Sequence, residues 1–114
     1  MYLENWKDSK FEGMMNDFEE KSEEWKDINV LFAIYSNFCY EGGAFVLFER
    51  NGKLYEVNGS HCSCYGLEGQ WDPEETDIEA IRHRIDHGTL GQGLYDNDNF
   101  ADELKKELNK LESK

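Results

Sequence analysis

The residues best suited to chemistry lie in one short segment, GSHCSCYGLEGQW, residues 59 to 71. His61, Cys62 and Cys64 are side chains that Zn²⁺ accepts as ligands. The remaining thiol and imidazole groups of the chain are Cys39, His83 and His87. In an extended segment Cys62 and Cys64 point the same way and His61 points opposite, so a shared ion requires a sharp turn. The Cys-x-Cys spacing also differs from the Cys-x₂-Cys of common zinc knuckles. We therefore favour a structural loop with small buried side chains over a zinc site, and expect no cofactor.

The same segment offers a possible nucleophile, because Cys62 and Cys64 follow an imidazole directly. A nucleophilic cysteine needs a nearby base and a surrounding that favours the thiolate. The acids just downstream oppose a thiolate: Glu68, Asp72, Glu74 and Glu75. A disulfide between residues 62 and 64 would be strained. A thiol- or metal-dependent enzyme built on residues 61 to 64 is thus an alternative, and we expect a non-enzymatic protein.

A second group of potential ligands is the pair His83 and His87, with Glu79 one turn before them. On a helix, residues four apart are neighbours, so this row could hold a metal ion. It lacks the glutamate of the HExxH motif, since residues 84 and 85 are Arg and Ile. An exposed row of polar side chains is the favoured interpretation.

Residues 68 to 79, EGQWDPEETDIE, contain six acids and no base, with a tryptophan among them. An aromatic side chain surrounded by charge is typical of protein interfaces. We predict a partner-binding surface formed by Tyr65, Trp71, Asp72, Glu74, Glu75 and Asp77. The equally weighted alternative is that Trp71 covers the core above the sheet.

The elements that position these residues follow from hydrophobic periodicity. Spacings of mostly three, four and seven predict an amphipathic helix over residues 2–27, interrupted at most at Gly13. Short apolar runs rich in β-formers predict strands over 29–35, 43–50 and 53–58. Asn51-Gly52 is the signal of a type I′ hairpin between the last two. A loop is expected over 59–72.

Two helices are expected in the C-terminal part of the chain. Asp72 as N-cap and Pro73 at the first helical position predict a helix over 73–87, ended by Gly88. Apolar residues at helical spacing predict a last helix over about 98–112. The predicted fold is α+β, a single domain of residues 1–114 with a three-stranded antiparallel meander, one N-terminal helix and two C-terminal helices.

Composition limits the class of partner. The 114 residues carry a net charge of −13. Such a charge disfavours direct contact with nucleic acid and with anionic membranes, and it favours a basic protein surface. Three cysteines are an odd number, and the N-terminal residues MYLENWKDSK do not resemble a secretion signal. We therefore expect a cytoplasmic protein with reduced thiols. The oligomeric state is left open, with a homodimer allowed.

The stretch YEGGAFVLFERNGKLYEVNGSHCSCYGLEGQWDPEE, residues 40 to 75, resembles a segment of small uncharacterised proteins of tailed bacteriophages. The resemblance implies an accessory phage product that acts in the host cytoplasm, and no catalytic residue carries over from it. It implies a host-takeover function in which the protein binds and inhibits a host protein. A DNA mimic that inhibits a nucleic-acid-binding protein is the alternative within the same context.

Overall fold

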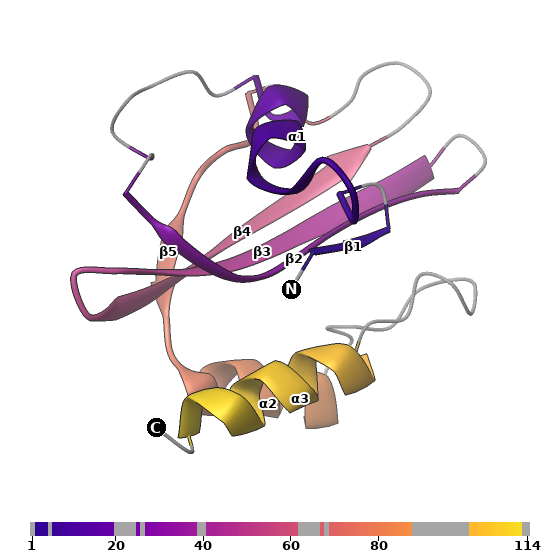
Figure 1. Cartoon of the computed structure of the whole chain (residues 1–114). Helices are drawn as coiled ribbons and strands as arrows, with labels where there is room; N and C mark the ends of the chain where they lie inside the picture. The colour runs from indigo at the N-terminus through magenta and orange to yellow at the C-terminus, as the bar shows by residue number, and fades with distance from the viewer. Residues whose placement is uncertain are drawn as a thin grey trace. The chain divides into compact units, whose positions relative to one another are not determined.

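The computed structural model describes residues 2–4, 6–19, 25, 27–38, 41–61, 67, 69–87 and 101–112 of the chain. They form, in order, β1 (Tyr2–Glu4), α1 (Lys10–Asp17), β2 (Asn29–Phe38), β3 (Glu41–Arg50), β4 (Lys53–His61), β5 (Glu74–Thr76), α2 (Ile78–His87) and α3 (Ala101–Glu112) (Figure 1). The fold is α+β, as predicted. The chain divides into two compact units, Met1–Glu75 and Thr76–Lys114. The single-domain organisation stays a prediction.

The strands form one mixed sheet in the order β1-β2-β3-β4-β5. The predicted antiparallel meander is its centre, and it is flanked by two short strands that the sequence pattern did not indicate. β1 runs parallel to β2, with Leu3 opposite Ile34. The central strands are longer than predicted, because β2 extends to Phe38, β3 begins at Glu41 and β4 extends to His61.

The hairpin between β3 and β4 confirms the Asn51-Gly52 prediction. Both residues have positive φ, 56° and 79°, as a type I′ turn requires. Arg50 pairs with Lys53 across this turn, and the register then places Phe48 opposite Tyr55.

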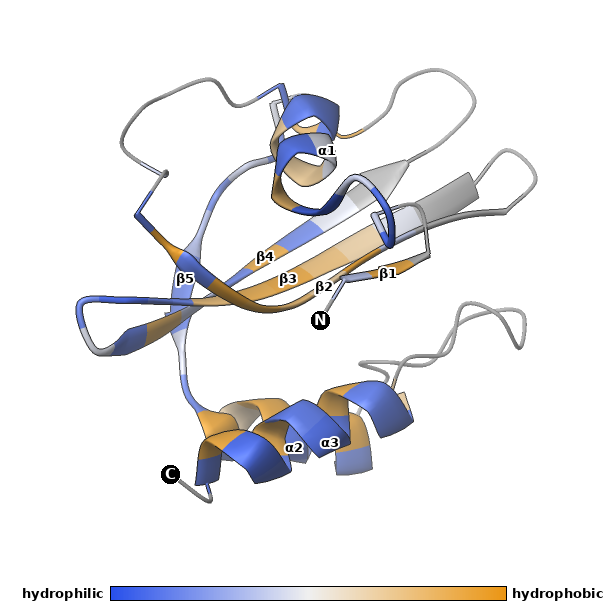
Figure 2. Ribbon diagram, viewed as in Figure 1, coloured by the Kyte–Doolittle hydropathy of each residue, from blue (hydrophilic) through white to orange (hydrophobic). Residues whose placement is uncertain are grey.

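Both faces of the central strands bury side chains. On one face Ala33, Val46 and Val57 lie side by side across the three strands and are buried. On the other face Phe32, Leu47 and Glu56 are aligned in the same way and are also buried. The apolar runs that predicted these strands thus supply buried side chains to both faces of β2 and β3, whose apolar colouring is visible in Figure 2. Glu56 is the polar exception, and its carboxylate accepts a hydrogen bond from the amide of Asn58 at 3.4 Å.

The predicted helix over residues 2–27 was wrong at both ends. Residues 2–4 form a strand, and the helix is limited to Lys10–Asp17. Lys10 and Glu19, with φ of 54° and 55°, stand at its two ends in the left-handed region, through which a right-handed helix cannot continue. Apolar spacing alone did not reveal these breaks. Residues 20–24 and 26 lie outside the described part of the chain.

The predicted start of the second helix was also wrong. Residues 74–76 form strand β5, and α2 begins at Ile78. Asp77 supplies the N-cap, because its Oδ1 accepts a hydrogen bond from the backbone N–H of Ala80 at 2.7 Å. Asp72 and Pro73 precede the strand instead. The last helix is described from Ala101, within the predicted range of 98–112.

One face of the sheet carries the core of the Met1–Glu75 unit. Its buried members are Trp6, Met14, Met15, Phe18, Ala33, Tyr35, Ala44, Val46, Phe48, Val57 and Leu67. Trp6 is fully buried, and its indole Nε1 donates a hydrogen bond to Asp17 Oδ2 at 2.7 Å. This bond ties the turn before α1 to the last residue of the helix, so the N-terminal segment is fixed over the sheet.

Gly59 of β4 lies close to two buried side chains of the core. A Cβ at this position would lie 2.9 Å from Leu67 Cδ2 and 3.4 Å from Phe18 Cε1. A glycine therefore lets Leu67 and Phe18 pack against the strand without a shift of either side chain. Of the predicted loop 59–72, residues 59–61 belong to β4, and Gln70 N donates to Leu67 O at 3.0 Å in a turn where Gly69 has φ of 78°. Residues 62–66 and 68 lie outside the described part of the chain.

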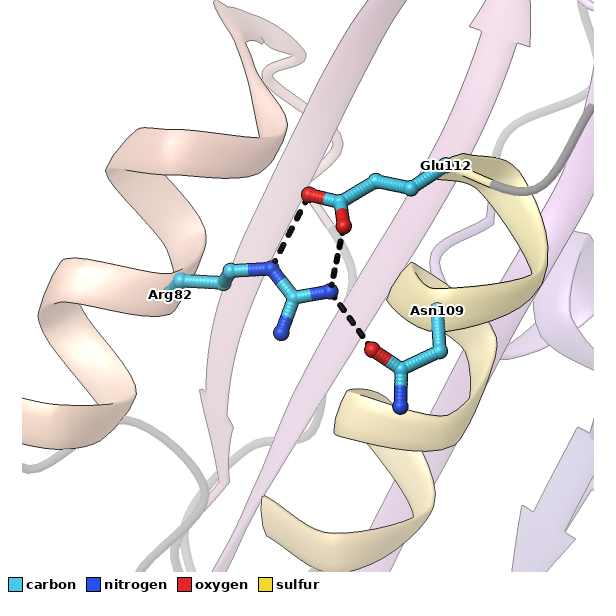
Figure 3. Close-up of polar contacts among 3 residues, drawn as sticks. All are labelled: Arg82, Asn109 and Glu112. Carbon is cyan, nitrogen blue, oxygen red and sulfur yellow. Dashed lines mark hydrogen bonds and ion pairs between the residues drawn. The ribbon is translucent and has the colours of Figure 1, made fainter.

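In the Thr76–Lys114 unit, α2 and α3 lie side by side (Figure 1). Each has an apolar stripe and a hydrophilic remainder, and the buried residues are Ile81 and Ile85 on α2 and Leu104 and Leu108 on α3 (Figure 2). Arg82 joins the helices through its guanidinium (Figure 3). Its Nε and Nη2 lie 3.2 and 3.1 Å from the two carboxylate oxygens of Glu112, and Nη2 also donates to Asn109 Oδ1 at 2.7 Å.

Candidate functional site

The most distinctive surface feature of the Met1–Glu75 unit is a group of four rings, Trp25, Phe48, Tyr55 and Trp71, which we call the aromatic corner. Phe48 is fully buried at its centre and the other three are partly buried around it. The Phe48 ring stacks on Trp71 at 5.8 Å and on Tyr55 at 5.5 Å, centroid to centroid. Trp25 meets Phe48 and Trp71 edge-on at 6.1 and 5.9 Å. Three indole or phenol rings thus keep part of their surface in solvent.

Trp71 was weighed as an interface anchor or as a cover of the core, and the structure shows that it packs on the core. Besides its contacts in the corner, it meets Phe18 edge-on at 5.2 Å. Its indole Nε1 is buried and has no hydrogen-bond partner among the described residues. A buried indole N–H normally donates a hydrogen bond. Trp71 Nε1 is thus a buried donor without an acceptor among the described residues.

A cation already lies against the aromatic corner. The guanidinium carbon of Arg50 is 5.0 Å from the centroid of a Trp25 ring, which is within the range of a cation–π interaction. Arg50 Nε is also 3.7 Å from Asp27 Oδ1. The corner and its nearest carboxylate therefore accommodate a guanidinium by the combination of ring face and negative charge.

Three of the predicted partner-binding acids follow Trp71 directly. Asp72, Glu74 and Glu75 are all exposed, and the last two are on strand β5. Glu75 lies 3.9 Å from Lys53 of β4, an exposed ion pair that contributes little stability. The simpler explanation of these charges is that they protect an edge strand from pairing with other chains. That explanation and a binding function are compatible, because both need the carboxylates to face solvent.

Asp77, also predicted to bind a partner, has a different position. It belongs to the Thr76–Lys114 unit, and its carboxylate is used as the N-cap of α2. Trp71, Asp72, Glu74 and Glu75 belong instead to the Met1–Glu75 unit. Tyr65, the remaining predicted residue, lies outside the described part of the chain.

The predicted metal and thiol site lies largely outside the described residues. The backbone of His61 ends β4 opposite Gly42, whereas Cys62 and Cys64 are not described. Within the described ranges no three His, Cys, Asp or Glu side chains are grouped so as to hold a metal ion. Zinc binding at residues 61–64, and the thiol-dependent enzyme built on it, remain sequence-based predictions.

Sequence reasoning missed most of the aromatic corner. Trp25, Phe48, Tyr55 and Arg50 were not assigned to the site, although part of the signal was present. A two-residue turn at Asn51-Gly52 dictates the pairs Arg50–Lys53 and Phe48–Tyr55, so the stacking of these two rings followed from the hairpin register. The arrival of Trp25 and Trp71 at the same place depends on distant segments, which no local pattern indicates.

In comparisons with known proteins, no family model, no curated protein and no solved structure matches the chain. Among the described helices, none has the length and apolar character needed to cross a membrane. The function is therefore argued from the site itself.

Proposed function

We propose that this chain is a non-enzymatic binding protein that docks on a basic surface of another protein. The docking surface comprises the aromatic corner and the three exposed carboxylates of Asp72, Glu74 and Glu75. The observation that carries the proposal is the partly buried trio of Trp25, Tyr55 and Trp71, together with the acids that follow Trp71 in sequence. The arginine that lies against Trp25 supports a basic side chain as the group that this surface would bind.

The two parts of the surface have different tasks in binding. Large rigid rings provide most of the affinity of an interface at a small cost in conformational entropy. Exposed carboxylates, in a chain of net charge −13, accelerate the encounter with a basic partner and repel acidic ones. Lysine or arginine side chains of the partner would lie over the rings and against the carboxylates, as Arg50 does beside Asp27.

The nature of the partner comes from the resemblance of residues 40–75 to small phage proteins. In that context the partner is a host protein, and its inhibition follows if the covered surface is the one that the host protein uses for its own ligand. Nucleic-acid-handling proteins have such basic surfaces. Mimicry of DNA charge is the second candidate, and the exposed acids support it equally.

The proposal is tested with two variants that change charge by the same amount. The first is Asp72→Lys, Glu74→Lys, Glu75→Lys; the control is Asp8→Lys, Glu12→Lys, Glu19→Lys, three acids that are also exposed in the same unit. Each variant and the wild type is used to capture proteins from nuclease-treated bacterial lysate, and the affinity for any captured protein is then measured after purification.

We expect the first variant to bind the captured protein at least about tenfold more weakly than the control variant. Equal affinity of the two variants would reject this surface, and the absence of any captured protein would reject the binding function. The salt dependence distinguishes the candidates. A DNA mimic loses affinity steeply and in proportion to the number of ion pairs as salt rises, whereas a ring-anchored interface retains most of it.

A further inference from the structure

The last turns of α2 carry two histidines whose rings lie close together. His83 and His87 are both exposed, and their ring centroids are 4.9 Å apart with an angle of 40° between the planes. The spacing of four residues accounts for their proximity, since it brings the two side chains onto one face of the helix. The expected row of exposed polar side chains is thus present, and the structure adds the distance and angle between the two rings.

This distance is compatible with two imidazoles that share a metal ion. A Zn–N bond of about 2.0–2.1 Å places the ring centroid roughly 3.2 Å from the ion. Two such rings that subtend about 90–110° at the ion then have centroids about 4.5–5.2 Å apart. The observed 4.9 Å lies within this interval. We propose that His83 and His87 chelate one divalent transition-metal ion, of the group Zn²⁺, Ni²⁺ and Cu²⁺, which prefer imidazole nitrogen.

The charges around the pair are compatible with a cation. Glu79 lies one turn before His83 and is exposed, and Asp86 adjoins His87. On the opposing side Lys105 of α3 is bound to Asp86 at 3.4 Å, and the guanidinium of Arg82 is held by Glu112. Arg84 lies about 100° around the helix from His83, but it is three residues before His87 and so is a neighbour of that side chain. Lys105 and Arg82 are therefore paired with carboxylates, whereas Arg84 is a positive group beside His87, countered by Glu79 at the other end of the row.

Two histidines leave the other coordination positions of the ion to water or to another molecule. The expected complex has one ion per chain, and it does not involve Cys62 or Cys64. Because the pair exists only when α2 is helical, the ion stabilises the folded form of this helix by mass action.

The test is a calorimetric titration with Ni²⁺ of the wild-type chain, of His83→Asn, of His87→Asn and of the double variant. Ni²⁺ is the probe because it favours imidazole over the many exposed carboxylates. We expect saturable one-to-one binding that weakens at least about tenfold in each single variant, since loss of a ligand should cost no less than loss of an outer-shell partner. The double variant should retain only the weak carboxylate background.

A control keeps the number of histidines but changes their spacing: His87→Asn combined with Arg84→His. Residues 83 and 84 do not face each other on a helix, so this variant should bind as weakly as His87→Asn. Recovery of wild-type affinity in the control would show that histidine content, and not the pair, determines binding. Wild-type affinity in the double variant would place the ion elsewhere, for example at residues 61–64, and would overturn the proposal, as would the absence of saturable binding in the wild type.

Discussion

The core of Met1–Glu75 is built from large rings on one face of a sheet, whereas the helices of Thr76–Lys114 combine four buried aliphatic residues with a polar junction at their surface. In the first unit, rings from segments far apart in sequence pack together. Trp71 meets Phe18, Trp25 and Phe48 within 6 Å, centroid to centroid. In the second, Arg82 spans the helices through hydrogen bonds to exposed partners.

This difference affects both stability and function. Buried rings contribute through apolar area and close packing, which depend little on salt. Exposed ion pairs contribute less and are screened by salt. The first unit therefore provides a firm base on which the partly exposed rings of the aromatic corner are held in position. The second unit presents ionisable side chains, including the histidine pair, on helices of which the surface is largely hydrophilic.

The largest expected effect is that of Phe48→Ala, at the centre of the aromatic corner. It removes a fully buried ring that stacks on Tyr55 and Trp71. We expect a loss of about 3–5 kcal/mol in the free energy of unfolding, measured by urea denaturation. Phe48→Leu is the control, with a cost nearer to about 1.5 kcal/mol. A cost of Phe48→Ala no larger than that of the control would contradict the central role of the ring stack.

The same denaturation curves test whether the two units unfold together. All three tryptophans lie in Met1–Glu75, so fluorescence reports on that unit. The two longest of the described helices lie in Thr76–Lys114 and contribute strongly to the far-ultraviolet circular dichroism. If the two signals coincide, the single-domain prediction is supported. Separate transitions, with only the fluorescence transition shifted by Phe48→Ala, would show two independent domains.

An intermediate effect is expected for Gly59→Ala. The new methyl group would lie 2.9 Å from Leu67 Cδ2, so the buried Leu67 side chain must shift. We expect a destabilisation of about 1–3 kcal/mol in thermal or urea unfolding. Gly43→Ala is the matched control on β3, because its Cβ meets only the Gly59 carbonyl oxygen, at an ordinary 3.5 Å. Equal stability of the two variants would indicate that the packing around Gly59 is loose.

The smallest effect belongs to the polar junction of the helices. A double-mutant cycle of Arg82→Ala and Glu112→Ala should give a coupling free energy of about 0.5–1 kcal/mol, which decreases as salt is added. The Lys110–Glu107 pair within α3, at 3.3 Å, is the comparison, with about 0.3 kcal/mol expected. A coupling free energy well above that range and insensitive to salt would show that the Arg82–Glu112 pair is shielded from water. The two units would then differ less than the exposure of these residues implies.

Part of this organisation could be predicted from the sequence. Strands at residues 29–35, 43–50 and 53–58 and the hairpin at Asn51-Gly52 were recognised because apolar runs of β-formers and turn chemistry involve only neighbouring residues. The helix ending at His87 was recognised by its isoleucine stripe. Its beginning was misplaced, since both Asp72 and Asp77 are acceptable N-caps. The choice between them depends on whether residues 74–76 pair with β4, which is a long-range contact.

The candidate site was predicted less completely than the fold. Trp71, Asp72, Glu74 and Glu75 were identified by composition, and Asp77 was included although its carboxylate caps a helix. Trp25 was missed because a tryptophan in a predicted amphipathic helix is usually a core residue. Tyr55 and Arg50 were missed because their place beside Trp25 and Trp71 depends on contacts between distant segments. The outcome for His61, Cys62, Cys64 and Tyr65 stays a prediction.

By itself, the sequence determined the net charge, the positions of the central strands, the type I′ turn and the four-residue spacing of His83 and His87. Each of these is a property of residues that are neighbours in the chain. Only the tertiary structure decided that residues 2–4 pair with β2, that α1 is confined to Lys10–Asp17, and that Trp25 and Trp71 join Phe48 in one aromatic corner. These outcomes depend on which distant segments meet. Burial of apolar area stabilises any pairing of segments that covers the core, so the packing of the whole unit selects one pairing.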